Sequence, residues 1–336
     1  MRILLTGGCG FIGSHTALAL LEAGHEPILF DNFANSSAKV AERLAGLAGR
    51  LLTSIEGDIR DVPLVRSVLA DQQIDAVIHF AGLKAVAESV ANPLAYYLNN
   101  VGGMLALAEA MQAEQIKRIV FSSSATVYGE PQVLPIPEDH RTQAVNPYGQ
   151  GKLICEQILA DLARGDGQWQ VSLLRYFNPV GAHSSGLIGE DPKGIPNNLM
   201  PLLTRAASGE LGPLSVYGTD YPTADGTAVR DYIHVMDLAE GHVAALEALG
   251  RGPGCEVYNL GTGRGTSVSE LIAAFEEATA VTVPQVPADR RPGDVAEIYA
   301  ATGKAERELG WRAKRGLAEM CADSWRFAKR NDQSRN

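Results

Sequence analysis

Paired cysteines and metal-binding histidine patterns are missing from this sequence. It has 4 cysteines in 336 residues, and they form neither a CxxC pair nor the spacing of a zinc site. The 7 histidines do not form an HExxH pattern. These absences argue against a disulfide scaffold, and they predict no metal site and cysteines that stay reduced, as in cytoplasmic proteins.

Positive charge is also scarce, because 29 lysines and arginines stand against 39 aspartates and glutamates, a net charge of −10. This excess of acid argues against a nucleic-acid or anionic-membrane partner. No apolar run is long enough to span a bilayer. A strand pattern begins at residue 2, so we expect no signal peptide and a cytoplasmic location. Apolar content of 46% is typical of a globular enzyme.

A glycine-rich turn follows the first apolar run. Residues 2–6 favour a strand and residues 11–23 have a helical pattern, with Gly7, Gly10 and Gly13 at the junction. These glycines allow a tight turn, close approach of the backbone to a pyrophosphate, and packing of the helix on the strand. The helix start then offers amide donors to the phosphate. The spacing GxxGxxG, in place of GxGxxG, favours a dinucleotide site of the short-chain dehydrogenase type.

An acid ends the second predicted strand. Asp31 lies eighteen residues beyond Gly13, and a carboxylate there can bind the adenosine ribose hydroxyls and repel a 2′-phosphate. We therefore expect NAD as the cofactor, in preference to NADP. The alternative is that Asp31 only caps a turn with Asn32. It is less favoured because strand, glycines, helix, strand and acid occur in the required order.

A tyrosine and a lysine four residues apart predict the chemistry. Asn146 and Pro147 are typical of a helix start, which places Tyr148 in the first turn with Lys152 on the same face. The helix end and the ammonium are expected to lower the phenol pKa from about 10. The phenolate could then take a proton from an alcohol while the cofactor takes the hydride, with Ser124 holding the substrate oxygen. A tyrosine that only covers a helix start is the weaker alternative.

Strand and helix patterns alternate through the first half of the chain. They predict an α/β fold with a Rossmann-type doubly wound parallel sheet, in which ligands bind beyond the carboxyl ends of the strands. Strands are expected at 2–6, 27–31, 52–55, 75–80, 117–122 and 170–175, with helices at 11–23, 38–48, 61–72, 94–113 and 147–164. Further helices are expected at 198–209, 236–248, 267–279 and 316–329. We expect an NAD-binding domain over 1–175 with a return segment at about 232–262, and a smaller α/β substrate domain mainly over 176–330.

Glycine, proline and asparagine become dense after residue 176. Long irregular segments of this kind usually form binding surfaces. The guanidinium groups of Arg230 and Arg291 suit a diphosphate, although surface ion pairs with Asp231 and Asp294 are an equal alternative. Two asparagines of this region could bind a sugar or uracil, or could only stabilise turns; they are Asn178 and Asn198.

Longer motifs occur in order along the chain, at residues 82–86, 122–129, 174–182, 194–201 and 230–237. With them, essentially the whole sequence resembles the UDP-glucose 4-epimerases of the extended short-chain dehydrogenase/reductase superfamily. The resemblance implies a redox-neutral exchange of UDP-glucose and UDP-galactose through a 4-ketosugar, with NAD kept bound. It implies that Tyr148 is the base on the sugar 4-hydroxyl, that Ser124 binds the same oxygen, and that Lys152 holds the nicotinamide ribose.

The resemblance also implies the ligand contacts. For NAD they are Gly7, Gly10, Phe11, Ile12, Gly13, Asp31, Asn32, Asn35, Ser36, Asp58, Ile59, Phe80, Ala81, Gly82, Lys84, Asn99, Ser122, Tyr148, Lys152, Tyr176 and Phe177. For the UDP-hexose they are Ser124, Asn178, Asn198, Leu199, Tyr217, Arg230, Arg291, Asp294 and Ile298. A homodimer packed through the helices near 94–113 and 147–164 is implied as well, although the sheet alone could account for their apolar faces.

Other activities remain possible from the sequence. Ile298 stands where the resemblance implies control of N-acetylated sugars by residue size, and it is neither tiny nor aromatic, so UDP-N-acetylhexosamine or UDP-pentose 4-epimerisation stays open. A nucleotide-sugar dehydratase is disfavoured because Ala125 and Thr126, after Ser124, carry no carboxylate. A net dehydrogenase is not excluded. A non-catalytic NAD-binding protein is disfavoured by the presence of Ser124, Tyr148 and Lys152 together.

Overall fold

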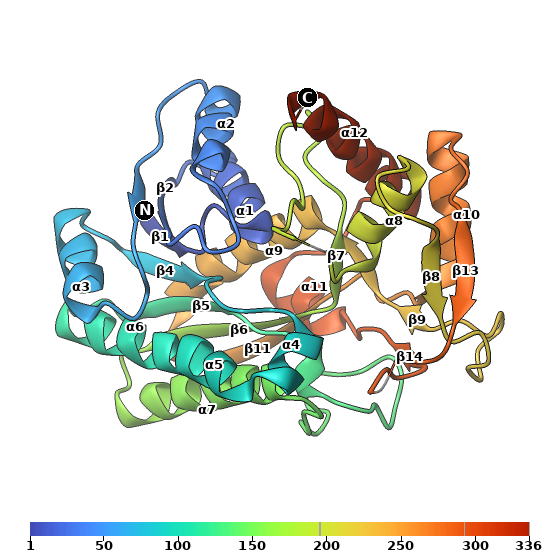
Figure 1. Cartoon of the computed structure of the whole chain (residues 1–336). Helices are drawn as coiled ribbons and strands as arrows, with labels where there is room; N and C mark the ends of the chain where they lie inside the picture. The colour runs from blue at the N-terminus through green and yellow to red at the C-terminus, as the bar shows by residue number, and fades with distance from the viewer. Residues whose placement is uncertain (195, 292, 336) are drawn as a thin grey trace.

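A parallel sheet of seven strands forms the centre of the protein in the computed structural model, which describes residues 1–194, 196–291 and 293–335 (Figure 1). The strand order is β11-β6-β5-β4-β1-β2-β3, and each neighbouring pair is parallel. The strands are β1 (Arg2–Thr6), β2 (Glu26–Asp31), β3 (Ser54–Glu56), β4 (Ala76–His79), β5 (Arg118–Ser122), β6 (Gln170–Tyr176) and β11 (Gly254–Leu260). Ile195, within the 194–201 motif, lies outside the described residues.

Helices cover both faces of this sheet, which confirms the predicted Rossmann-type doubly wound fold. On one face lie α1 (Phe11–Glu22), α2 (Ala38–Ala48) and α9 (Val235–Ala248) (Figure 1). On the other lie α3 (Val62–Asp71), α6 (Gly102–Ala113) and α7 (Pro147–Gly165). No helix within the described residues combines the length and the apolar character that crossing a bilayer needs.

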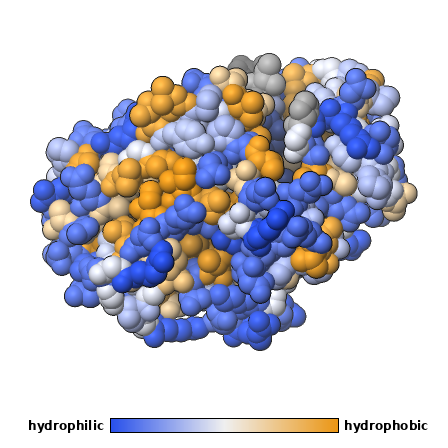
Figure 2. Space-filling view, turned by 90° about the horizontal axis from the view of Figure 1, so that it is seen from below, coloured by the Kyte–Doolittle hydropathy of each residue, from blue (hydrophilic) through white to orange (hydrophobic). Residues whose placement is uncertain are grey.

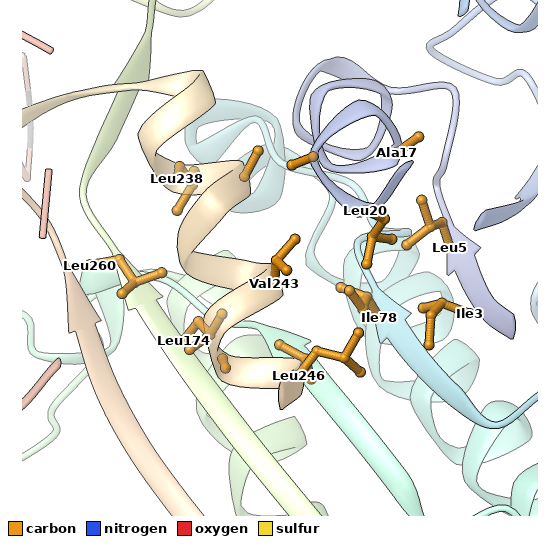
Figure 3. Close-up of a cluster of buried hydrophobic side chains, with 14 of the residues drawn as sticks. Ile3, Leu5, Ala17, Leu20, Ile78, Leu174, Leu238, Val243, Leu246 and Leu260 are labelled. Carbon is orange, nitrogen blue, oxygen red and sulfur yellow. The ribbon is translucent and has the colours of Figure 1, made fainter. Parts of the chain in front are cut away.

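Alternation of side chains along the strands supplies both halves of the core. Ile3 and Leu5 of β1 point into the cluster with α1 and α9, where Leu20 and Leu246 meet them (Figure 3). Leu4, between them, points into the opposite cluster with α3, α6 and α7. All these side chains are buried, and each contributes about 1.5–3 kcal/mol by the usual scale for burying a leucine or isoleucine.

The predicted helix over 94–113 is divided in the structure. It consists of α5 (Pro93–Tyr96), a π-helical turn (Tyr97–Val101) and α6, and α4 (Val86–Ala91) precedes it. A turn with the wider hydrogen-bond spacing keeps the chain helical but shifts its faces. It presents the Asn100 side chain to Leu83, whose N donates to Asn100 Oδ1 at 2.8 Å and whose O accepts from Nδ2 at 2.9 Å.

The chain after residue 176 builds a second region of three small sheets beside the strand ends (Figure 1). The strands are β7 (Asn178–Val180), β8 (Leu214–Tyr217), β9 (Val229–Arg230), β10 (Tyr232–His234), β12 (Thr266–Ser267), β13 (Gln285–Ala288) and β14 (Glu297–Ile298). The helices are α8 (Leu199–Ala207), α10 (Val268–Thr279), α11 (Gly303–Leu309) and α12 (Leu317–Arg335). Both α9 and β11 return to the main sheet, β11 as its edge strand beside β6. The division into domains stays a prediction.

Candidate active site

A cleft of about 1450 Å³ lies at the carboxyl ends of the strands and is lined by both regions of the chain. Of all the residues expected at the cofactor and substrate sites, every one except Asp58 lines this cleft. Asp58 pairs instead with Arg60, 2.6 Å away, and this partner lowers the pKa of the Asp58 carboxyl to about 2. The structure therefore brings the predicted cofactor and substrate residues to one place, with Asp58 just outside it.

The glycine turn lies against the backbone of the next strand end. Gly7 has φ of +70°, and a Cβ there would come within 2.8 Å of Ala81 N. A Cβ on Gly13 would come within 2.3 Å of Gly7 O. Gly10 is the N-cap of α1, and it lines the cleft. A turn this tight at a helix start leaves backbone amides for a phosphate, so the residues present fit a dinucleotide.

Asp31, at the end of β2, organises the neighbouring loop. Its carboxylate accepts hydrogen bonds from Cys9 N at 3.0 Å, Phe33 N at 2.9 Å and Ser36 Oγ at 2.8 Å. These bonds show that Asp31 does shape a turn, and it also lines the cleft where an adenosine ribose is expected. The two interpretations of Asp31 are therefore compatible with each other.

The start of α7 presents Tyr148 and Lys152 to the cleft. Gly149 N donates to the side chain of the N-cap Asn146 at 2.8 Å, and Pro147 is the first helical residue, so the predicted helix start is confirmed. One turn later, Lys152 Nζ donates to Ser122 O at 2.6 Å and lies 6.0 Å from the centroid of the Tyr148 ring. The lysine is thereby tied to the carboxyl end of β5.

Burial dominates the electrostatics of this pair. It lowers the pKa of Lys152 to about 8 and raises the pKa of Tyr148, because the protein around both groups disfavours their charged forms. A hydrogen bond with Ser124 acts on Tyr148 in the opposite direction. The expected lowering of the phenol pKa is therefore not found in this structure, where burial is the larger cause and the hydrogen bond with Ser124 is the smaller, opposing one.

Ser124 is held so that its own proton is free to point away from its neighbours. Its Oγ accepts from Thr126 N at 3.2 Å and from Thr126 Oγ1 at 3.0 Å. A hydroxyl has one donor and two acceptor positions, so these bonds leave the donor for Tyr148 or for a ligand oxygen. Nearby, the Ser122 hydroxyl is hydrogen-bonded to the Tyr176 hydroxyl.

The far end of the cleft carries the two predicted arginines. Arg291 stacks on Tyr217, with its Cζ 3.9 Å from the ring centroid. Arg230, on β9, lies 3.8 Å from Asp294. Asp231 has other partners, because it is fully buried and accepts from the backbone of Thr262, Gly263 and Ala300. The alternative of ion pairs to both aspartates therefore applies only to Arg230 with Asp294.

Sequence reasoning missed Glu190, which joins the two ends of the site. Its Oε1 accepts from Lys84 Nζ at 2.7 Å and from Asn198 Nδ2 at 2.6 Å. Lys84 was expected at the cofactor and Asn198 at the substrate, so one carboxylate contacts both sets. Glu190 lies in an irregular loop with no periodicity, and the density of glycine and proline around it was the only sequence signal.

The fold and these side chains define the class of protein first: a short-chain dehydrogenase/reductase, with a serine, tyrosine and lysine beside a dinucleotide turn. Comparison with known proteins identifies the family within this class. The chain matches the family model described as GDP-mannose 4,6 dehydratase over residues 4–324. The UDP-glucose 4-epimerase of Bacillus subtilis (strain 168) is 59% identical over 331 residues, which are 98% of each chain.

Solved structures agree with the sequence comparison. The UDP-glucose 4-epimerase from Bifidobacterium longum, in complex with NAD+ and UDP, has a TM-score of 0.96 and 51% identity, with 99% of each chain covered. The one from Stenotrophomonas maltophila, with bound NAD and formylated UDP-arabinopyranose, has a TM-score of 0.97 and 47% identity at the same coverage. The chain belongs to the GDP-mannose 4,6 dehydratase family and, within it, to the UDP-glucose 4-epimerases.

Proposed function

We propose that this protein interconverts UDP-glucose and UDP-galactose by a redox-neutral change at sugar C4, with NAD as a bound cofactor. The observation that carries the proposal is the meeting of Tyr148, Ser124 and Lys152 with the glycine turn in one cleft. The near-full-length relatives with this activity support it. NAD, when bound, would supply a hydride acceptor that can return the hydride.

The residues of the chain divide the work of proton transfer. Tyr148 takes the proton of the sugar 4-hydroxyl, and the free donor of Ser124 holds the same oxygen. Lys152 stays fixed by Ser122 O and supplies positive charge near the phenol. Because burial raises the phenol pKa, the charged phenolate needs a cation nearby, and Lys152, 6.0 Å from the ring centroid, is placed to supply one.

The substrate end of the cleft binds the nucleotide firmly. Arg230 and Arg291 suit the diphosphate, and the Tyr217 ring, already stacked on Arg291, suits uracil. Near the reacting sugar, half-buried Ile298 on β14 offers only apolar contact. A firm hold on UDP with a loose hold on the sugar lets the 4-ketosugar turn over and take the hydride on its other face.

A dehydratase is the second candidate, because the matching family model has that description. Ala125 and Thr126 follow Ser124 at the cleft, and neither side chain can act as the acid that elimination of water requires. The epimerase is therefore favoured over the dehydratase. N-acetylated and pentose UDP-sugars remain alternative substrates, which Ile298 would govern.

The direct test is conversion by the purified protein. With UDP-galactose and no added NAD, we expect UDP-glucose to accumulate until the two sugars reach equilibrium. A preparation that contains NAD and leaves both sugars unchanged would refute the proposal. Appearance of a 4-keto-6-deoxy sugar would favour the dehydratase instead.

We also propose that the protein forms a homodimer through α4, α5, α6 and α7. Val90, Leu94, Leu98 and Leu105 of the first three helices and the π turn are exposed, Leu94 by 66% and Leu98 by 59%. Figure 2 looks at the lower face, where Figure 1 places these helices, and shows an apolar patch there. Patches of this kind usually mark an interface.

Light scattering after gel filtration tests the dimer. We expect twice the chain mass for the protein and the mass of one chain for Leu98→Asp. The control is Leu51→Asp, at a leucine that is 88% exposed between α2 and β3, which should remain dimeric. A wild-type monomer at micromolar concentration would contradict the proposal.

We propose that the protein is located in the cytoplasm. Cys9, Cys155, Cys255 and Cys321 are all unpaired thiols, as expected in a reducing compartment. Fractionation of cells that express the protein with a tag tests this. Recovery mainly outside the cytoplasm would contradict it.

A further inference from the structure

A buried ion pair lies directly behind the catalytic side chains. Glu156 follows Lys152 by one turn of α7, so Tyr148, Lys152 and Glu156 share one face of the helix. Arg175, on β6, donates to Glu156 from Nε at 2.9 Å and from Nη2 at 2.6 Å. The side chains of both residues are less than a tenth exposed. The carboxylate and the guanidinium thus form a two-point pair in the interior.

The pair is connected to the turn that carries Ser124. Ser123 points away from the cleft and donates from Oγ to Glu156 Oε1 at 2.5 Å. The residue before it, Ser122, accepts from Lys152. The segment 122–124 is therefore fixed from α7 at two successive residues, and Ser124 comes next on the cleft side.

Arg175 is itself anchored from a third element. Its Nη1 donates to Glu138 O at 3.1 Å, and its Cζ lies 4.9 Å from the centroid of the Tyr128 ring. Tyr128 follows the 122–127 segment directly and donates to Asn259 on β11 at 2.6 Å. The pair is part of a continuous polar network, in which each buried charge has partners.

The pair also acts electrostatically on Lys152, through the charge of Glu156. Around the ammonium, Tyr148, Cys155 and Glu156 come from α7 and His79 from β4, and Arg175 of β6 reaches it through Glu156. Burial keeps Cys155 and His79 neutral, since it raises the pKa of the thiol to about 11 and lowers that of the imidazole to about 3. Glu156 raises the pKa of Lys152 against the larger effect of burial.

We propose that Glu156 and Arg175 are positioning residues of the active site, which fix the 122–124 turn and keep the charge behind Lys152 balanced. The inference depends on the proposed epimerase activity. A purely structural pair would stabilise the fold and leave the protonation of Lys152 unaffected. Exchange of a buried ion pair for apolar or neutral groups is often tolerated by a fold, so the two roles can be separated.

Each single variant of the pair leaves one charged partner uncompensated, and the sign of that charge predicts the direction in which the pKa of Lys152 moves. Glu156→Gln leaves Arg175 uncompensated, which should lower the pKa of Lys152, and Arg175→Met leaves Glu156 uncompensated, which should raise it. If turnover needs charged Lys152, the alkaline limb of the kcat profile should move to lower pH in Glu156→Gln and to higher pH in Arg175→Met, each by about one pH unit. The double variant should return the limb close to its wild-type position.

Two further variants complete the experiment. Ser123→Ala keeps both charges, so it should lower kcat several-fold with no movement of the limb. Asp237→Asn is the matched control, because it removes another buried carboxylate, which pairs with the partly exposed Arg315, and neither residue lines the cleft. It should lower the melting temperature and leave the pH profile unchanged.

The outcomes separate the inference from the proposed function. A wild-type protein that does not convert UDP-galactose refutes the function. An active wild type, whose two single variants move the limb in the same direction or not at all, refutes the positioning role. If the single variants do not fold, Ser123→Ala decides the question, and a wild-type kcat in that variant refutes the positioning role.

Discussion

Lys152 Nζ lies 6.0 Å from the centre of the Tyr148 ring while it donates to Ser122 O at 2.6 Å. The lysine is thus held by the backbone at the end of β5, and it can affect the tyrosine through its charge without exchanging a proton with it. Acid–base chemistry at the sugar is left to the phenol.

Tyr148→Phe should lose turnover by about 10²–10⁴, the usual scale for a positioned acid–base group. The ring remains, so the cleft and the bound cofactor should be retained. Steady-state kinetics with UDP-galactose measure the loss. Tyr258→Phe is the control, because it removes a hydroxyl from a buried tyrosine of β11 outside the cleft. Comparable activity of Tyr148→Phe and the wild type would exclude the assigned role.

Asp31→Ser should weaken the preference for NAD over NADP. Two like charges about 4 Å apart repel by about 4 kcal/mol at an effective dielectric constant of 20, so removal of the carboxylate should improve NADP binding at least about tenfold. NAD binding should fall as well, since Asp31 also fixes the loop through Ser36. Titration of protein stripped of cofactor gives both constants. Asp71→Asn, at the end of α3, is the control, and an unchanged ratio of the constants in Asp31→Ser would count against the prediction.

Ile298 should control the size of the sugar. Ile298→Gly makes room beside the sugar and should raise kcat/KM for N-acetylated UDP-sugars relative to UDP-glucose by about tenfold or more, and Ile298→Tyr should lower the same ratio. A panel of UDP-glucose, UDP-galactose, their N-acetylated forms and UDP-pentoses measures it. Equal ratios in the three proteins would show that another residue sets the specificity.

Acid should destabilise the fold through buried histidines. Burial lowers the pKa of His242 to about 4 and those of His15 and His79 to about 3. The unfolded chain then binds protons below about pH 6.5 that the folded chain does not, so each histidine removes about 1.4 kcal/mol of stability per pH unit until its folded pKa is reached. Urea unfolding between pH 7 and 4 should show a shallower pH dependence for His242→Leu. A slope identical to that of the wild type would contradict this account.

Much of the Rossmann half of the fold could be predicted because its signals are local. Apolar runs such as Arg2–Thr6 and Gln170–Tyr176 are buried parallel strands, and Asn146 with Pro147 marks a helix start. The edge strand Gly254–Leu260 was missed. Each of its residues pairs with a residue of β6 that lies 84 positions earlier in the sequence, and its own sequence, GCEVYNL, has mixed polarity. The two-residue strands β9, β12 and β14 are too short for any period to appear.

The candidate site was predictable where residue identity decides the chemistry, and unpredictable where surroundings decide it. Spacing gave the Tyr148–Lys152 face, but burial, which reverses the expected pKa shift of Tyr148, depends on strands far away in the sequence. The stack of Arg291 on Tyr217 joins two loops with no shared pattern. The role of Glu190 likewise becomes visible only through its hydrogen bonds with Lys84 and Asn198, which lie elsewhere in the sequence.

The return of the same hydride to the same carbon is the central claim, and an isotope follows it directly. UDP-galactose with deuterium at C4 should give UDP-glucose that keeps the deuterium at C4, in ordinary water and with no NAD added. Mass spectrometry and NMR of the product measure this. Loss of the label to solvent, or release of labelled NADH in amounts equal to the protein or larger, would contradict the account.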